Sequence, residues 1–182
     1  MFSKIFTLGL AALTFVSAAP ATGFQSPMGI SCNVHVQSVG ASAASYSLDA
    51  GRYRILDVST NSWLRGYTPD VPLYVSLTRE FPGPFAEWDV KPAKEGAFTI
   101  RNVGLDSSVY VGNDKTILVG PKQDPVPFAI EAAGDDTFVV KSVNADLVWT
   151  LKTPGRVRSE VQLSPEQGKE AQRWKFIKLD DN

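Results

Sequence analysis

Three stretches of this sequence follow one pattern, and this repetition restricts the possible folds more than any other feature. Each stretch begins with an aromatic residue, has a β-branched residue two positions later and ends with a valine five positions after the aromatic. The stretches are 53–58, 98–103 and 138–143. Side chains alternate between the two faces of a strand, so the aromatic and the β-branched residue lie on one face. The pattern therefore predicts three equivalent β-strands.

A second pattern closes each repeat with another strand. An aromatic residue is followed two positions later by an apolar one, and an aliphatic residue lies eleven positions before that aromatic. The closing pairs are Trp88 and Val90, Phe128 and Ile130, and Trp174 and Phe176, and the aliphatic residues are Leu77, Ile117 and Leu163. Further β-type runs lie between these landmarks, at 63–64, 109–111 and 148–149. Each repeat, about 40 residues long, is thus predicted to contain four strands.

The fold class follows from the way such repeats must pack. From Leu48 onward, short β-type runs alternate with clusters of Gly, Pro, Asn and Asp, and no segment keeps a helical period. One four-stranded unit cannot bury its apolar face alone, so the three units must share a core. A closed threefold barrel also removes exposed strand edges. We therefore expect an all-β protein with the β-trefoil fold and twelve strands.

The N-terminal residues have the pattern of an export signal. Lys4 precedes a short apolar run at 5–16, and the small residues Ser17 and Ala18 follow it. This is typical of a signal peptide at residues 1–18, cleaved after Ala18 or Ala19. The run is too short to span a bilayer, and no later stretch approaches the required ~20 apolar residues. We expect a secreted, extracellular protein with no membrane partner.

The segment at 19–47 differs in composition from the rest of the chain. It is rich in Ala, Ser and Gly, and residues 20–47 contain no Asp, Glu, Lys or Arg. Such a composition is typical of a linker, an arm or a propeptide. Residues 48–182 then form the predicted trefoil domain. Cys32 is the only cysteine and lies in the arm, so no intramolecular disulfide can form, and we expect an unpaired thiol.

Charge and residue usage exclude several functional classes. Lys and Arg number 18 against 19 acidic residues, a balance that argues against a nucleic-acid partner. The only histidine, His35, lies in the arm, so a catalytic site would need a base from that segment. The adjacent Asp135 and Asp136 follow Gly134 and are typical of a turn. We expect no catalytic residue, no metal site, no cofactor and a monomer.

The core pattern resembles the fungal β-trefoil inhibitors of serine peptidases. The resemblance is carried by the residues at 51–55, by Val-Pro-Phe-Ala-Ile at 126–130 and by Gln-Arg-Trp-Lys-Phe at 172–176, and it covers about residues 48–179. It implies a fungal inhibitor of trypsin-like peptidases that acts through an exposed loop. The Gln172-x-Trp174 element is also similar to ricin-B-like trefoil lectins, which makes carbohydrate binding the alternative.

Two loops contain arginines suited to the acidic pocket of a trypsin-like peptidase. The first is 65–70, where Arg65, Gly66 and Tyr67 are the candidate residues and Pro69 would stiffen the loop. The second is 153–160, in which Pro154-Gly155 marks a turn and Arg156 and Arg158 are the candidates. Arg65 and Arg156 are equally good choices by sequence, because charged residues are common in loops.

Other surfaces remain open alternatives. The loop at 80–85 carries Phe81 and Phe85, which would suit a partner's groove, although its prolines also terminate strands. The turn at 112–115 is short and is predicted to be structural. For the lectin alternative, Trp63, Tyr67 and Trp149 are candidate sugar platforms, but Trp63 and Trp149 lie in β-type runs and favour the core. A scaffold that binds another protein is the third alternative.

Overall fold

The computed structural model describes residues 48–78, 82–121 and 124–180. The predicted signal peptide at 1–18, the arm at 19–47, Cys32 and His35 lie outside the described residues and stay predictions. Within the described residues, no helix has the length and apolar character needed to cross a bilayer.

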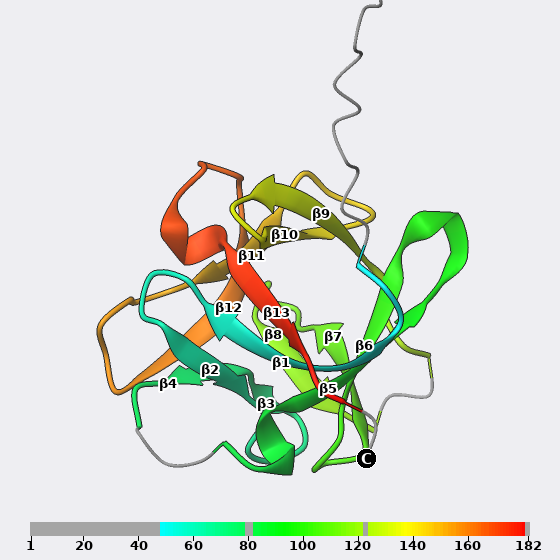
Figure 1. Ribbon diagram of the computed structural model, residues 1–182, viewed down its shortest axis with the longest axis horizontal. Coiled ribbons are helices and arrows are strands. Elements are labelled where there is room, and N and C mark those ends of the chain that lie inside the picture. The colour runs from blue at the N-terminus through cyan, green and yellow to red at the C-terminus, as the bar shows by residue number, and fades with distance from the viewer. Residues whose placement is uncertain (1–47, 79–81, 122–123, 181–182) are drawn as a thin grey trace, which may run out of the picture. The chain divides into compact units, whose positions relative to one another are not determined.

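Twelve strands of the described chain form the three predicted repeats (Figure 1). Repeat one has β1 (Gly51–Asp57), β2 (Ser62–Arg65), β4 (Tyr74–Ser76) and β5 (Glu87–Pro92). Repeat two has β6 (Phe98–Asn102), β7 (Ser107–Val111), β8 (Ile117–Gly120) and β9 (Phe128–Gly134). Repeat three has β10 (Thr137–Ser142), β11 (Val148–Leu151), β12 (Arg158–Ser164) and β13 (Trp174–Lys178). A thirteenth strand, β3 (Val71–Pro72), and three short 3₁₀ turns, η1 (Pro84–Ala86), η2 (Lys94–Gly96) and η3 (Glu170–Gln172), complete the elements.

The first and last strands of the repeats close into a six-stranded barrel. β1 pairs with β5, β5 with β6, β6 with β9, β9 with β10, β10 with β13, and β13 returns to β1, all antiparallel. The inner two strands of each repeat pair with each other, as β2–β4, β7–β8 and β11–β12. This arrangement is the β-trefoil, and it confirms the predicted fold.

The predicted landmark residues build the shared core. Trp88, Phe128 and Trp174 are fully buried, as are the β-branched residues of the opening strands, Ile55, Ile100 and Val140. Each such side chain contributes roughly 1.5–3 kcal/mol when it leaves water. The Phe128 and Trp149 rings meet edge to face at 5.2 Å. The core thus forms where the three repeats converge.

Repeats one and three share one side-chain hydrogen bond to the backbone. The indole nitrogen of Trp88 donates to the Leu64 carbonyl and that of Trp174 to the Trp149 carbonyl, both at 3.3 Å. Because both bonds tie the closing strand to the second strand of the same repeat, they hold the hairpin against the barrel.

One of the three aliphatic landmarks differs from the other two. Leu77 is 36% exposed, whereas Ile117 and Leu163 are buried. In repeat one, Val75 at 1% exposure fills the core instead, because β4 ends at Ser76. Leu77 therefore belongs to the surface, beside Val157 just before β12, the third strand of repeat three.

Candidate functional site

The first candidate loop begins later than the sequence predicts. Arg65 is the last residue of β2, pairs with Tyr74 and is only 8% exposed. The prediction that Arg65 projects from an exposed loop is wrong, because strand pairing continues through it. Gly66 is also buried: its N–H donates to the Phe85 carbonyl at 3.0 Å, and an added Cβ would lie 3.0 Å from Leu105 Cδ1. Neither residue can reach a partner's pocket.

The rest of this loop is fastened to repeat two. The Asp70 N–H donates to the Val119 carbonyl at 2.6 Å, and the Tyr110 hydroxyl donates to Asp70 Oδ1 at 2.8 Å. β3 then pairs with β8 at Val71 and Val119. Of the three candidate residues in this loop, only Tyr67 lies partly at the surface.

The second candidate loop is a closed turn on a fixed base. The Lys152 N–H donates to the Glu160 carbonyl at 2.9 Å, and their side chains form an ion pair at 3.1 Å. One step further in, the Thr153 N–H donates to Ser159 Oγ at 2.9 Å. Ser159 is 2% exposed, so its hydroxyl anchors the turn to the domain interior.

The tip of this turn carries the exposed arginine. Gly155 has φ of 86°, which lets the chain reverse, and the Arg156 N–H donates to the Thr153 carbonyl at 3.4 Å. Arg156 is exposed, and its neighbour Val157 is 68% exposed. The structure thus places Arg156 at the tip, where the sequence predicts it, while its role remains a prediction.

The two candidate loops meet, which the sequence does not reveal. β12 pairs with β4 across the boundary between repeats three and one, with Arg158 opposite Ser76. The Arg158 guanidinium carbon lies 4.4 Å from the centre of the Tyr67 ring, and Tyr67 packs edge to face on Tyr74 at 6.0 Å. A guanidinium over an aromatic face is attracted by the ring's quadrupole. This contact therefore favours one direction of the Arg158 side chain.

These contacts define a single exposed surface, which we call the Arg156 face. Beside the tyrosine contact, the Leu77 N–H donates to the Val157 carbonyl at 3.1 Å. The face comprises Tyr67, Leu77, Arg156, Val157 and Arg158. It joins two cations to two exposed aliphatic side chains. In Figure 1 the turn between β11 and β12, which carries Arg156 and Val157, lies on the left of the view.

The third candidate loop contributes one exposed aromatic side chain to the described structure. Phe85 in η1 is 44% exposed, and Phe81 lies outside the described residues. The Phe85 carbonyl also accepts the Asn102 amide at 2.9 Å, so the backbone of this loop serves the scaffold.

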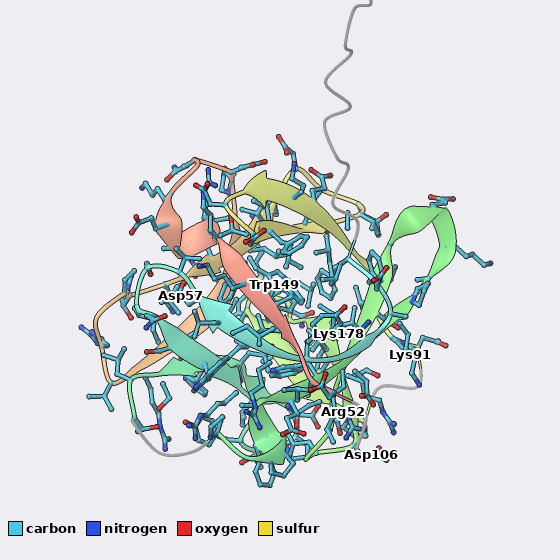
Figure 2. All side chains as sticks on the ribbon, viewed as in Figure 1. Arg52, Asp57, Lys91, Asp106, Trp149 and Lys178 are labelled. Carbon is cyan, nitrogen blue, oxygen red and sulfur yellow. The ribbon has the colours of Figure 1, made fainter. Side chains whose placement is uncertain are left out.

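The residues suggested by the lectin alternative are mostly structural. Trp149 is fully buried in the interior (Figure 2), and Trp63 is partly buried in β2. Gln172 is 1% exposed: its Oε1 accepts the Gln167 N–H at 2.7 Å, and its Nε2 donates to the Pro165 carbonyl at 2.8 Å. The Gln-x-Trp element therefore holds the fold together and provides no accessible group for a sugar.

One carboxylate is deeply buried, and its environment is structural. Asp57 is fully buried at the end of β1, and this desolvation raises the pKa of its carboxyl group, while hydrogen bonds from Thr60 and Ser59 oppose the shift. Asn102 occupies the same position in repeat two, since Asp57 pairs with Ser62 as Asn102 pairs with Ser107. Among the described residues, no cluster of His, Cys, Asp and Glu could hold a metal ion.

Comparison with known proteins shows the fold of this chain. No protein-family model matches the sequence, and no curated protein matches it. Among solved structures, the Rhizoctonia solani agglutinin is 24% identical with a TM-score of 0.62, over 75% of this chain and 100% of that one. The Macrolepiota procera ricin B-like lectin, solved with lactose, is 16% identical with a TM-score of 0.62, over 72% and 99%.

A proteinase inhibitor from Coprinopsis cinerea has the same architecture. It is 11% identical to this chain, with a TM-score of 0.60, over 73% of this chain and 100% of the inhibitor. The three neighbours are thus named as an agglutinin, a lectin and an inhibitor, and none as an enzyme. Identities this low show that the β-trefoil is shared, and function must be argued from the surface.

Proposed function

We propose that this protein is a secreted, monomeric, non-catalytic inhibitor of trypsin-like serine peptidases that binds through the Arg156 face. The observation that carries the proposal is the position of Arg156, exposed at the tip of a turn whose base is closed by Lys152 with Glu160 and Thr153 with Ser159. An extended cationic side chain on such a tip matches the deep acidic specificity pocket of these peptidases.

Rigidity of the turn supports binding. A loop that is already held in one shape loses little conformational entropy when a partner binds it. Here the base is held by backbone and side-chain hydrogen bonds, and the paired strands β11 and β12 carry it. The exposed Val157 and Leu77 beside the arginine supply apolar contact area, while Arg158 over Tyr67 adds a second, oriented cation.

A peptidase panel tests the proposal. We expect the protein to inhibit trypsin-like peptidases and to lose most of that inhibition in Arg156→Ala, while Arg156→Lys keeps the charge and retains part of it. Removing a buried charged anchor costs about 2–5 kcal/mol, or roughly a thirtyfold or larger rise in the inhibition constant. Lys91→Ala is the matched control, since Lys91 is an exposed cation on the right-hand side of Figure 2, away from the turn.

The proposal fails if no serine peptidase is inhibited, or if Arg156→Ala inhibits as well as the unaltered protein. Cysteine peptidases belong in the same panel. Inhibition of these alone would also contradict the proposal, because the proposed partner is a trypsin-like serine peptidase.

Carbohydrate binding is the second candidate, and one observation favours it. The partly exposed Tyr110 presents a ring whose hydroxyl donates to Asp70 Oδ1 at 2.8 Å. An aromatic face beside a hydrogen-bonding carboxylate is the combination that sugar sites use. Binding on a glycan array that is lost in Asp70→Ala would support this function, and an array without any signal would exclude it.

A further inference from the structure

An apolar pocket lies at the end of the barrel, away from both candidate loops. It has a volume of about 420 Å³, which falls within the range of small-molecule sites. The residues that matter here come from the chain entry and from strands β9, β10 and β13 with the β9–β10 turn: Leu48, Ala132, Asp135, Asp136, Phe138 and Phe176. The Arg156 face contributes no residue to it.

Two aromatic rings form its wall, and one of them, Phe176, breaks the threefold symmetry. Phe138 and Phe176 are both partly exposed and meet edge to face at 5.5 Å. The equivalents of Phe176 in the other repeats are Val90 and Ile130, which are aliphatic and buried. Repeat three instead presents an accessible aromatic surface.

Two carboxylates stand at the edge of the same pocket. Asp135 and Asp136 form the β9–β10 turn with φ of 52° and 55°, and both are exposed. None of the ion pairs found in the described chain involves either of them, and no Lys or Arg lines the pocket in that part of the chain. The pocket therefore combines an apolar interior with uncompensated negative charge.

We propose that this pocket binds a small aromatic molecule that carries a protonated amine. The ring of such a ligand would pack against Phe138 and Phe176, and its ammonium group would lie beside Asp135 and Asp136. Aromatic faces attract cations, and carboxylates add Coulomb attraction that a neutral or anionic ligand does not gain. The site is separate from the proposed inhibitory surface and goes beyond it.

The wall of the pocket on β9 is fixed, which makes a blocking substitution practical. A register shift between Thr137 and Phe138 leaves Ala133 without a strand partner, and the Ala133 carbonyl instead accepts a hydrogen bond from Arg173. Its neighbour Ala132 is exposed and lines the pocket. A large side chain at position 132 would thus fill the pocket from the surface without entering the core.

Titration calorimetry on the full chain tests the proposal with three probes of one shape. The probes are 2-(1-naphthyl)ethylamine, which is a cation at pH 7, the neutral 2-(1-naphthyl)ethanol and the anion 3-(1-naphthyl)propanoate. We expect the amine to bind about tenfold more tightly than the alcohol, which corresponds to ~1.4 kcal/mol, and the anion to bind least. Added salt should reduce the preference for the amine.

Variants separate the contribution of the two carboxylates from that of the apolar pocket. The double variant Asp135→Asn, Asp136→Asn should keep the turn, because asparagine tolerates the left-handed conformation. Its affinity for the amine should fall to that for the alcohol. Ala132→Trp should abolish binding of both. Glu95→Gln is the control, an exposed acid with φ of 58° in η2, outside the pocket, and should change nothing. None of these variants should alter peptidase inhibition.

Three outcomes would overturn the proposal. The first is equal binding of the amine, the alcohol and the anion, and the second is amine binding that survives Ala132→Trp. The third is the absence of binding at millimolar probe.

Discussion

The guanidinium carbon of Arg158 lies 4.4 Å from the ring centre of Tyr67, although the two residues belong to different repeats. The contact exists because β12 of repeat three pairs with β4 of repeat one. It converts two separate loops into one surface. The predictions below concern that surface first, and then the scaffold that supports it.

Tyr67 is expected to act through Arg158. Tyr67→Leu removes the ring, so Arg158 loses its preferred direction, whereas Tyr67→Phe keeps the ring and should leave inhibition unchanged. In a double-mutant cycle with Arg158→Ala, we expect a coupling of about 0.5–1 kcal/mol in the inhibition constant. A coupling of zero would mean that the contact does not contribute to binding.

Ser159→Ala should weaken inhibition without touching any residue of the Arg156 face. The change removes the hydroxyl that accepts the Thr153 N–H, so the turn becomes more flexible. A more flexible turn loses more conformational entropy when it binds a peptidase. We expect a loss of about 1 kcal/mol, or roughly fivefold in the inhibition constant. The control is thermal melting, which should show that Ser159→Ala is folded. If the folded variant dissociates from the peptidase at the same rate as the unaltered protein, the rigidity of the turn does not contribute to binding.

Asp57→Asn should stabilise the protein at neutral pH. Burial raises the pKa of Asp57 in the folded state, so the folded state holds its proton more tightly than the unfolded chain does. The resulting stability is present below the unfolded pKa and is lost as the pH rises through the folded pKa. Repeat two shows that an amide fits, since the Leu105 N–H donates to Asn102 Oδ1 as the Thr60 N–H donates to Asp57 Oδ2.

Urea unfolding at several pH values measures this effect. We expect the variant and the unaltered protein to be nearly equal in acid and to diverge as the pH rises, by about 1 kcal/mol in the free energy of unfolding at pH 7. A difference that is largest in acid would contradict the assigned direction of the pKa shift.

Gln172→Ala should cost stability and leave carbohydrate binding, if any, unchanged. The buried amide bonds the Gln167 N–H, the Pro165 carbonyl and Thr150 Oγ1, and alanine leaves those partners unpaired. We expect a loss of about 2–4 kcal/mol in the free energy of unfolding, measured with denaturant. A folded variant of unaltered stability that lost sugar binding would make Gln172 a site residue instead.

Much of the scaffold could be predicted from single positions. The spacing of Tyr53, Phe98 and Phe138 and of the closing aromatics predicted the barrel strands, because a repeating apolar pattern has to be buried by its own repeats. Spacing alone does not decide burial, since Leu77 has the same spacing as Ile117 and Leu163 but follows the end of β4 and is 36% exposed. Spacing identifies a strand more reliably than it identifies its last residue.

The candidate site depended far more on the tertiary structure. By sequence, Arg65 and Arg156 were equivalent, each a loop arginine in the matching part of its repeat. The fold separates them, since Arg65 is held in β2 by pairing with Tyr74 while Arg156 stands on a turn that extends beyond its strands. Whether a loop arginine is exposed depends on which strands pair beside it.

The threefold repeat that determined the fold is a local property, because each repeat contains its own strands and its own core residues. The candidate binding surfaces, in contrast, are built by residues from different repeats. Tyr67 meets Arg158, and Asp70 meets Tyr110, only through pairings between different repeats, which no periodicity within a repeat records. The sequence by itself therefore determined the β-trefoil core, and the contacts between repeats decided which side chains a partner can reach.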